Sequence, residues 1–411
     1  MRPRFFAPIV GLALVTSTVL VAAPPARAEG AFRAVGTLER FPQEALDTFP
    51  VLFQGSPYES RMLNGTLLPV PEAGQLWQVY RATASHTSGV LVRDNRTLKV
   101  IGSFPIGSLL RRATFSIGYG AEWLHAVDGG RRVFLVDFRN RLLEVDTSSF
   151  AVRDAGELSV AESSADGLLE PLVVAGMTWD PASQQLLVLY GGPPNTTVAN
   201  RVTVLQRFDP ATGRRVNRVV HSCTGPLPAT DYTGDTLATA PLADADAFYV
   251  PCQRDTFAPG FGLLSSSIVV RLPRAAAWEP SGEETSVVVG GPMDSALSDP
   301  SAGRMTVLDW EGRFTVVDVR TMAVVGSHHA SPGGSGRVGP GIDPATGRVF
   351  FQSDHGLGWV DARATPPTAT VEPSLAAEAQ ESIVTVGRRI FVLTGHAHDK
   401  ALRYTIYQVV P

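Results

Sequence analysis

The chain has 411 residues, of which 44% are apolar, 18% charged and 8% aromatic, and its formal net charge is −4. These values exclude a disordered chain, a coiled coil and a disulfide-stapled miniprotein, and they leave enough apolar side chains for a large core. The mild acidity and the lack of a basic run give no electrostatic reason to expect nucleic acid as a partner.

The first 28 residues have the layout of a secretory signal peptide. Met1-Arg-Pro-Arg4 is basic, an apolar run from Ile9 to Ala23 follows, and Ala26-Arg-Ala28 resembles a cleavage site of small residues. The apolar run is about 15 residues long, shorter than the roughly 20 that a membrane-spanning helix needs. We therefore expect a signal peptide over 1–28 and a mature domain over 29–411. This domain would be secreted or extracytoplasmic in the cell envelope, without a transmembrane anchor.

An apolar strand ending in Asp, followed closely by Thr or Ser, recurs along the chain. The copies read Leu91-Val-Arg-Asp94-Asn-Arg-Thr97, Leu143-Glu-Val-Asp146-Thr-Ser-Ser149, Gln206-Arg-Phe-Asp209-Pro-Ala-Thr212, Val316-Val-Asp318-Val-Arg-Thr321 and, weakened, Trp359-Val-Asp361-Ala-Arg-Ala364. Near residue 270, Ile268-Val-Val-Arg-Leu-Pro273 supplies a strand without the Asp. Because an Asp side chain bonds the backbone two residues on, the pattern predicts tight turns between antiparallel strands.

A second family of turns lies about half a repeat out of phase with the first. It reads Trp179-Asp-Pro-Ala-Ser-Gln, Ser298-Asp-Pro-Ser-Ala-Gly-Arg304 and Ile342-Asp-Pro-Ala-Thr-Gly-Arg348, and each copy precedes an apolar strand. Val127-Asp-Gly-Gly-Arg131 is the same device with Gly in place of Pro. Short strands between turn signals indicate an all-β fold, and a repeat of about 50 residues with four strands indicates a β-propeller.

The repeats predict a single domain, a seven-bladed β-propeller of four-stranded antiparallel blades. Six blades have their third strands near residues 91, 143, 205, 269, 315 and 358. The seventh has Arg389–Leu393 and Leu402–Tyr407 but lacks an outer strand, which Phe32–Leu38 can supply. Lending the first strand to the last blade closes the ring and removes exposed strand edges. Six or eight blades stay open as alternatives.

With these turns the chain resembles the seven-bladed propellers of the YVTN and quinoprotein amine dehydrogenase-like repeat superfamily. The resemblance covers nearly all of residues 30–411 and rests on the Asp-Pro-Ala-Thr-Gly-Arg turns and the Asp-ended strands. The class includes enzyme subunits, lyases, lactone hydrolases and binding scaffolds, so the resemblance implies a fold but does not choose a function.

Each blade has two ends, and the predicted turns occupy only one of them. We call the end with both regular turn families the turn face, and the opposite end the loop face. Irregular insertions fall on the loop face at 41–61, 105–122, 158–176, 222–235 and 254–267. Long loops on a rigid frame commonly carry binding sites, and Arg and aromatic side chains dominate such surfaces. The candidate contact residues are Arg81, Arg111, Arg112, Tyr119, Tyr232, Arg254, Phe257, Phe261 and Arg337.

Histidines are also expected at the loop face, in the connections of neighbouring blades. The candidate metal ligands are His355, His396 and His398, with Asp399, Asp354 or His86 as acid–base groups. His328 and His329 leave the outer strand of the fifth blade toward the same face. Imidazole suits Zn, Cu, Ni and Fe, and three ligands with an open position would make a catalytic site. The alternative is that these histidines are isolated loop residues exposed to solvent.

Cys223 and Cys252, the two cysteines of the chain, predict one disulfide in an exported protein, with two buried free thiols or half of a metal site as the alternatives. No CxxCH haem motif, GxSxG elbow or HExxH helix occurs. The sequence therefore favours a non-enzymatic propeller that binds a small ligand or an extracytoplasmic protein on its loop face. The alternative is a metal-assisted lyase or hydrolase, with one divalent transition metal as cofactor, acting on a small molecule at the histidines.

Overall fold

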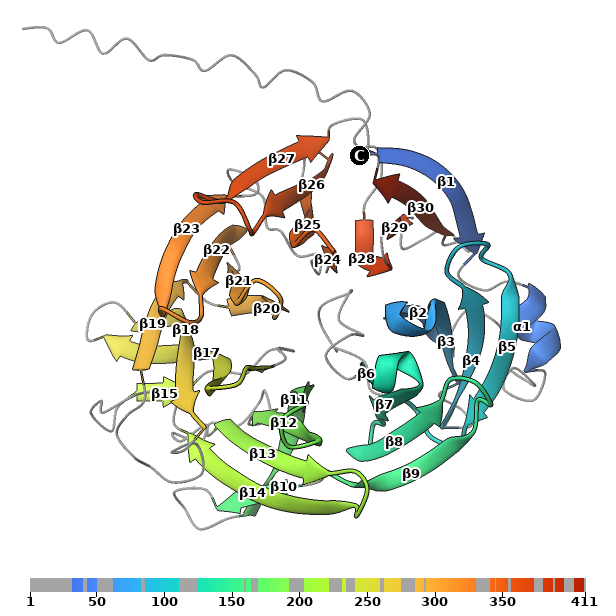
Figure 1. Ribbon diagram of the computed structural model, residues 1–411, viewed down its shortest axis with the longest axis horizontal. Coiled ribbons are helices and arrows are strands. Elements are labelled where there is room, and N and C mark those ends of the chain that lie inside the picture. Colours follow the sequence, from blue (N-terminus) through green and yellow to red (C-terminus); the bar gives the residue numbers. More distant parts are fainter. Residues whose placement is uncertain are drawn as a thin grey trace, which may run out of the picture.

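The structure is a computed structural model in which the chain forms a ring of β-sheets (Figure 1). It describes residues 32–39, 43–49, 62–82, 86–110, 124–158, 160–163, 169–191, 203–221, 231–233, 241–258, 262–274, 285–291, 293–309, 311–329, 341–343, 345–353, 356–372, 380–386, 389–394 and 403–409. The predicted signal peptide lies outside these residues.

Seven antiparallel sheets follow one another around the ring, as the two turn families predict. Blades 1 to 3 contain β2 (Met62–Val70), β3 (Gln75–Ala82), β4 (Thr87–Asp94), β5 (Val100–Ile106); β6 (Leu124–Val127), β7 (Arg132–Val136), β8 (Arg141–Asp146), β9 (Val152–Glu157); and β11 (Leu169–Asp180), β12 (Gln185–Gly191), β13 (Thr203–Asp209), β14 (Arg214–His221). Blades 4 and 5 contain β16 (Leu242–Ala243), β17 (Ala247–Ala258), β18 (Gly262–Pro273), β19 (Thr285–Gly290); and β20 (Met293–Asp299), β21 (Arg304–Asp309), β22 (Arg313–Asp318), β23 (Ala323–His329). Blade 6 contains β24 (Gly341–Asp343), β25 (Arg348–Ser353), β26 (Gly356–Asp361) and β27 (Thr368–Glu372).

The last blade is completed by the first strand of the chain, as predicted. Its sheet order is β1-β30-β29-β28, with β28 (Gln380–Val386), β29 (Arg389–Thr394), β30 (Arg403–Val409) and β1 (Phe32–Glu39). In Figure 1 the blue β1 lies beside the dark red β30 and closes the ring. Helix α1 (Gln43–Thr48) follows β1, and its Glu44 carboxylate accepts a hydrogen bond of 2.8 Å from the Arg93 guanidinium of blade 1.

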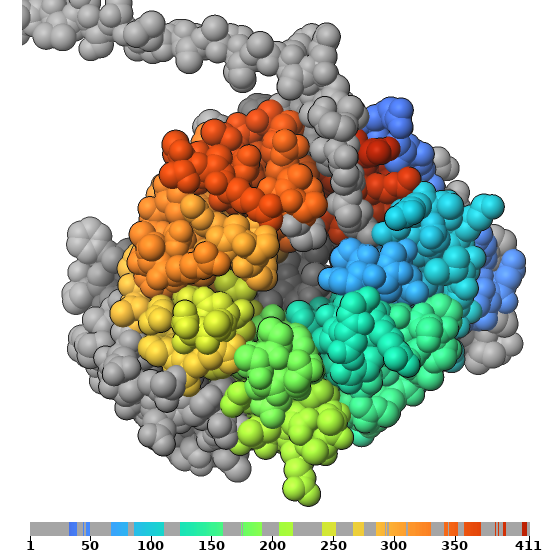
Figure 2. Space-filling view, viewed as in Figure 1, coloured from blue at the N-terminus to red at the C-terminus, as the bar shows by residue number. Residues whose placement is uncertain are grey.

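The hydrophobic core is divided among the seams between neighbouring blades. In β12, Leu186, Val188 and Tyr190 pack toward blade 2, whereas Leu187 and Leu189 pack toward blade 4. Because successive strand residues point to opposite faces and both faces of a blade are covered, such strands read as continuous apolar runs rather than alternating patterns. In the space-filling view the blades abut one another around the ring (Figure 2).

The recurrent Asp residues form the predicted turns. Asp94 Oδ1 accepts hydrogen bonds from the backbone N–H groups of Arg96 at 3.0 Å and Thr97 at 2.6 Å. The Thr97 amide, followed by the Thr97 hydroxyl, lowers the pKa of the Asp94 carboxyl. The second turn family is built in the same way, since Asp343 accepts from the amide of Ala345 and the hydroxyl of Thr346. Because each of these bonds joins residues close together in the sequence, a short sequence pattern is enough to predict the turns.

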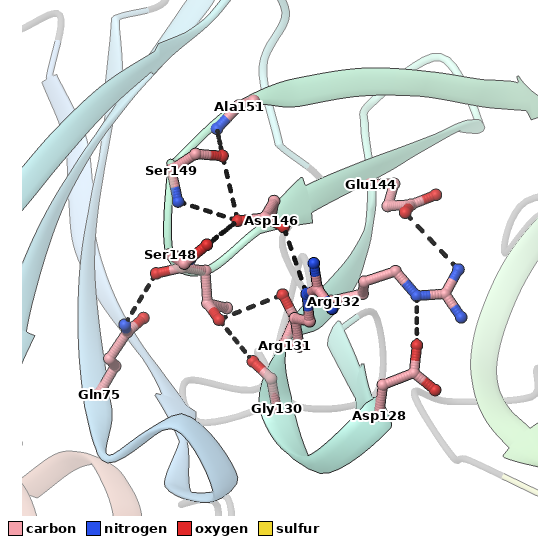
Figure 3. A network of polar contacts seen from close by, with 11 residues as sticks. Gln75, Asp128, Gly130, Arg131, Arg132, Glu144, Asp146, Ser148, Ser149 and Ala151 are labelled. Carbon is pink, nitrogen blue, oxygen red and sulfur yellow. Dashed lines mark hydrogen bonds and ion pairs between the residues drawn. The ribbon is translucent and has the colours of Figure 1, made fainter.

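Both turn families lie on one face, where turns of neighbouring blades are joined. The Gln75 amide of blade 1 donates to the Thr147 carbonyl in the turn of blade 2 at 3.1 Å, and the Thr147 hydroxyl donates to the Gly130 carbonyl at 2.7 Å (Figure 3). At the seam of blades 3 and 4, Arg274 donates two hydrogen bonds to the Asp180 carboxylate. Contacts of this kind form a structural belt that joins neighbouring blades on the turn face.

Candidate functional site

The loop face, opposite this belt, carries the structure that does not repeat from blade to blade. Two short strands are added there: β10 (Val160–Ser163) pairs with the start of β11, and β15 (Asp231–Thr233) pairs with β17. Residues 254–267 were expected to form an irregular loop, and this expectation is wrong. Residues 254–258 and 262–267 are strand, and register pairs run from Gln253↔Ser267 to Ala258↔Gly262.

Blade 4 extends beyond its own outer strand. β17 and β18 each have 12 residues, whereas the corresponding strands of blades 2, 5 and 6 have five or six. β19 pairs with β18 only between Ser267 and Arg271. Residues 231–233, 254–258 and 262–266 thus form a three-stranded sheet past the end of β19, at the left of the ring in Figure 1. We call this sheet the blade-4 extension.

Three predicted contact residues belong to strands of this extension. The register pairs Tyr232 with Asp255 and Thr233 with Arg254, and Phe257 lies two residues further along β17, paired with Leu263. The fold therefore brings Tyr232, Arg254 and Phe257 within one small sheet, although Tyr232 is more than 20 positions away in the sequence.

The other predicted contact residues are not brought together by the described part of the structure. Arg81 lies in β3, opposite Leu63 of β2 and Ser88 of β4, in blade 1. Arg111, Arg112, Tyr119, Phe261 and Arg337 lie outside the described residues. Their role in binding stays a prediction.

A chain of hydrogen bonds connects the base of the extension to blade 5. The Ser267 hydroxyl donates to the Gly291 carbonyl at 2.6 Å, and the Gly291 amide donates to Asp309 Oδ2 at 3.4 Å. Asp309 Oδ1 in turn accepts from the amides of Glu311 at 3.0 Å and Arg313 at 2.8 Å. The Asp309 side chain is thereby fixed between two blades.

Arg313 ends this chain in a basic pair on the loop face. The Arg313 side chain donates a hydrogen bond of 3.2 Å from Nε to Nε2 of the His329 imidazole. His328 and His329 are the exposed last residues of β23, as the sequence predicts. Among the described side chains, no carboxylate forms an ion pair with Arg313. The positive charge of this guanidinium is therefore not balanced by a described acidic partner.

The turn at Asp309 belongs to a third family that the sequence analysis missed. In blade 2, Asp137 Oδ1 accepts from the amides of Arg139 and Arg141, each at 2.8 Å, just as Asp309 accepts from Glu311 and Arg313. The shared signal is Asp, an aromatic residue, a charged residue, Asn or Gly, then Arg. In blade 2 this turn exposes 63% of Phe138 on the loop face.

The predicted metal site is only partly within the described structure. His86 is exposed in the connection between β3 and β4, with a positive φ of 53°. His355, His396, His398, Asp354 and Asp399 lie outside the described residues. Within the residues that the structure does describe, no three His, Cys, Asp or Glu side chains gather in a way that could bind a metal. The metal site stays a prediction.

The predicted cysteine pair is also only partly within the described structure. Cys252 lies in β17 opposite Ile268, in the second strand of blade 4 as expected, and Cys223 lies outside the described residues. The disulfide between them stays a prediction. No described helix is long and apolar enough to cross a membrane.

Comparisons with known proteins found similar solved structures but no similar sequence. No family model and no curated protein matches its sequence. The Cps50 (Swd1) β-propeller domain of Myceliophteria thermophila superposes with a TM-score of 0.47 and 12% identity, over 85% of this chain and 99% of that chain. BamB from Moraxella catarrhalis gives a TM-score of 0.43 and 12% identity, over 92% of this chain and 99% of that one. Membership of the YVTN or quinoprotein-like superfamily stays a prediction.

Proposed function

We propose that this protein is an extracytoplasmic binding protein whose loop face captures a partner protein through the blade-4 extension. The observation that carries the proposal is the continuation of β17 and β18 beyond β19, together with the added strand β15. The belt of turns on the opposite face needs no such element to hold the ring together. An additional sheet built onto one blade is therefore best explained by recognition.

The composition of the extension supports a protein partner over a small molecule. Tyr232, Arg254 and Phe257 are of residue types that are enriched in protein interfaces. A small-molecule site is typically a concave pocket that encloses its ligand. A sheet that continues past the end of its blade instead offers a surface and a strand edge.

Site-specific photocrosslinking tests this proposal. A benzoylphenylalanine replaces Phe257 in the extension or Arg96, which is exposed on the turn face and serves as the control. We expect a defined partner to be crosslinked from position 257 and not from position 96 in the host that exports the protein. The purified partner should then bind an Arg254→Ala/Phe261→Ala variant at least about tenfold more weakly, with unchanged thermal unfolding. Equal crosslinking at both positions, or unchanged affinity, would refute the proposal.

A metal-assisted lyase or hydrolase is the second candidate. It is favoured by the ring order, since hydrophobic seams join blade 6 to blade 7 and blade 7 to blade 1. His355, His396 and His398 would hold one divalent transition metal, which acts as a Lewis acid on the substrate. Elemental analysis of residues 29–411, purified without a tag or chelator, tests it. One metal ion per chain, lost in His396→Ala, would establish the site, and a metal-free protein would exclude it.

A further inference from the structure

We propose that the partner binds as an added β-strand along the outer edge of β18 at residues 262–265, and that this strand carries a carboxylate that pairs with Arg313. The inference rests on the proposed function and specifies the chemistry of its partner. It names an extended acidic segment of another protein as the occupant.

The edge itself is the first part of the argument. β17 covers one side of β18 along its whole length, but β19 covers the other side only from Ser267 to Arg271. Over residues 262–265 the outer side of β18 has no strand partner among the described residues. An edge of this kind presents backbone N–H and C=O groups that an extended peptide can pair with, as in β-strand addition.

This edge also lacks the features with which proteins block such pairing. No charged residue occurs between Asp255 and Arg271, and no proline occurs between Pro259 and Pro273. Natural edge strands are commonly protected by charges or proline. The outer strands of blades 2 and 3 follow that rule, since β9 contains Arg153, Asp154 and Glu157, and β14 contains three arginines. The β18 edge therefore lacks the charges that protect those strands.

The positive charge of Arg313 indicates which kind of strand would bind at this edge. The hydrogen-bond chain through Gly291 and Asp309 fixes Arg313 at the blade-5 side of the extension's base. The Arg313 guanidinium donates to Nε2 of His329, and the Asp309 carboxylate is already engaged by backbone amides. A carboxylate on the incoming strand would supply the missing negative charge, and such complementarity determines which partners associate.

Peptide binding to the mature protein, residues 29–411, provides the test. The probe is the capped peptide Thr-Val-Glu-Val-Asp-Val-Thr, which alternates strand-forming and acidic residues. One matched control replaces its two acids with Lys, and a second carries N-methyl groups on alternate amides, which removes donors for strand pairing. Affinity is measured by calorimetry, and the contact region by hydrogen–deuterium exchange.

We expect the acidic peptide to bind, and both control peptides to bind at least about fivefold more weakly. Amides of residues 262–265 should exchange more slowly in the complex. Arg313→Gln should weaken the acidic peptide, whereas Arg96→Gln on the turn face should not. Equal binding of the N-methylated peptide, or protection elsewhere in the ring, would overturn strand addition.

Two further outcomes separate this inference from the proposed function. If the partner crosslinked from position 257 protects other amides and leaves 262–265 unprotected, the extension binds a partner but not by strand addition. If the protein alone forms dimers that the peptide dissociates, in sedimentation experiments, a second copy is the occupant and the acidic-partner inference is wrong. If position 257 yields no partner and no peptide binds, both proposals fail.

Discussion

The guanidinium of Arg363 holds both carboxylate oxygens of Asp299 across the seam between blades 5 and 6. Nε lies 2.7 Å from Oδ2 and Nη2 lies 3.1 Å from Oδ1. Arg274 makes the equivalent contact with Asp180 between blades 3 and 4. In both pairs the Asp belongs to a turn after the innermost strand, and the Arg comes from the next blade. The pairs therefore tie separate repeats into one belt.

Removing one arginine should weaken this belt. The Asp299 side chain is only 3% exposed, so Arg363→Ala leaves a buried carboxylate without its ionic partner. We expect a loss of about 2 kcal/mol in the free energy of unfolding. Urea denaturation measures it, with the exposed turn residue Arg96→Ala as control. Equal stability of the two variants would show that the pair contributes nothing.

The same carboxylate should make stability depend on acid. Burial raises the pKa of Asp299, but hydrogen bonds from Arg363 and Ser301 outweigh this effect and hold it below the usual 3.8. The stabilisation is therefore complete above about pH 4 to 5 and is lost as the pH falls through the lowered pKa. Asp299→Asn should be less stable than the wild type at pH 6, and the difference should shrink toward pH 3. A difference that is independent of pH would contradict this assignment.

Alanine substitutions at two adjacent glycines distinguish the cost of backbone strain from the cost of a steric clash. Gly129 and Gly130 both have positive φ, at 65° and 84°. A Cβ on Gly129 would meet no atom within 4 Å, whereas one on Gly130 would lie 2.5 Å from the Ala73 backbone nitrogen of blade 1. Gly129→Ala should cost about 1 kcal/mol for the left-handed conformation. We expect Gly130→Ala to lower the free energy of unfolding by more than Gly129→Ala does, as measured by urea denaturation. Equal losses for the two variants would show that the backbone at the seam of blades 1 and 2 shifts to accommodate the Cβ.

His125 should make the seam of blades 2 and 3 sensitive to mild acid. Its Nε2 accepts a hydrogen bond of 3.2 Å from the Trp179 backbone amide, and burial lowers its pKa to about 4. The unfolded chain binds the proton near pH 6.5, so stability is full above that pH and falls between 6.5 and 4. We expect a loss of about 2 kcal/mol between pH 7 and 5.

The matched variant for that prediction is His125→Gln, whose side chain offers an acceptor but does not titrate. Its stability should change less than that of the wild type between pH 7 and 5. The comparison uses urea denaturation at both values of pH. If the two proteins lose the same stability, other groups cause the pH dependence.

The sequence predicts the ring because its turns are local. Asp94 and Asp343 each bond groups within three residues, so a short pattern determines the geometry. The Phe32–Leu38 strand was assigned to the last blade by counting, and β1 confirms it. In contrast, the Arg363–Asp299 contact joins residues 64 positions apart, which no local pattern reports.

The blade-4 extension was missed for a different reason. Strands within a blade are covered on both faces and read as apolar runs, whereas residues 253–256 and 265–267 are mostly polar and resemble a loop. Pro259-Gly260 was the available signal, since this dipeptide marks a turn between two strands. The predicted site residues at 354–355 and 396–399 lie outside the described residues and stay predictions.

Ring closure by β1 has a consequence for how the molecule assembles. Thr37 pairs with Thr405, so the outer strand of blade 7 has no partner until nearly the whole chain is available. During that interval β1 and the edge of β30 are both unpaired. The β1 strand of a second molecule can then pair with this β30 edge in the same register. Exchange of β1 between two chains would close both rings and keep every β1–β30 residue pair the same. At high concentration, refolding should therefore yield strand-exchanged dimers alongside monomers.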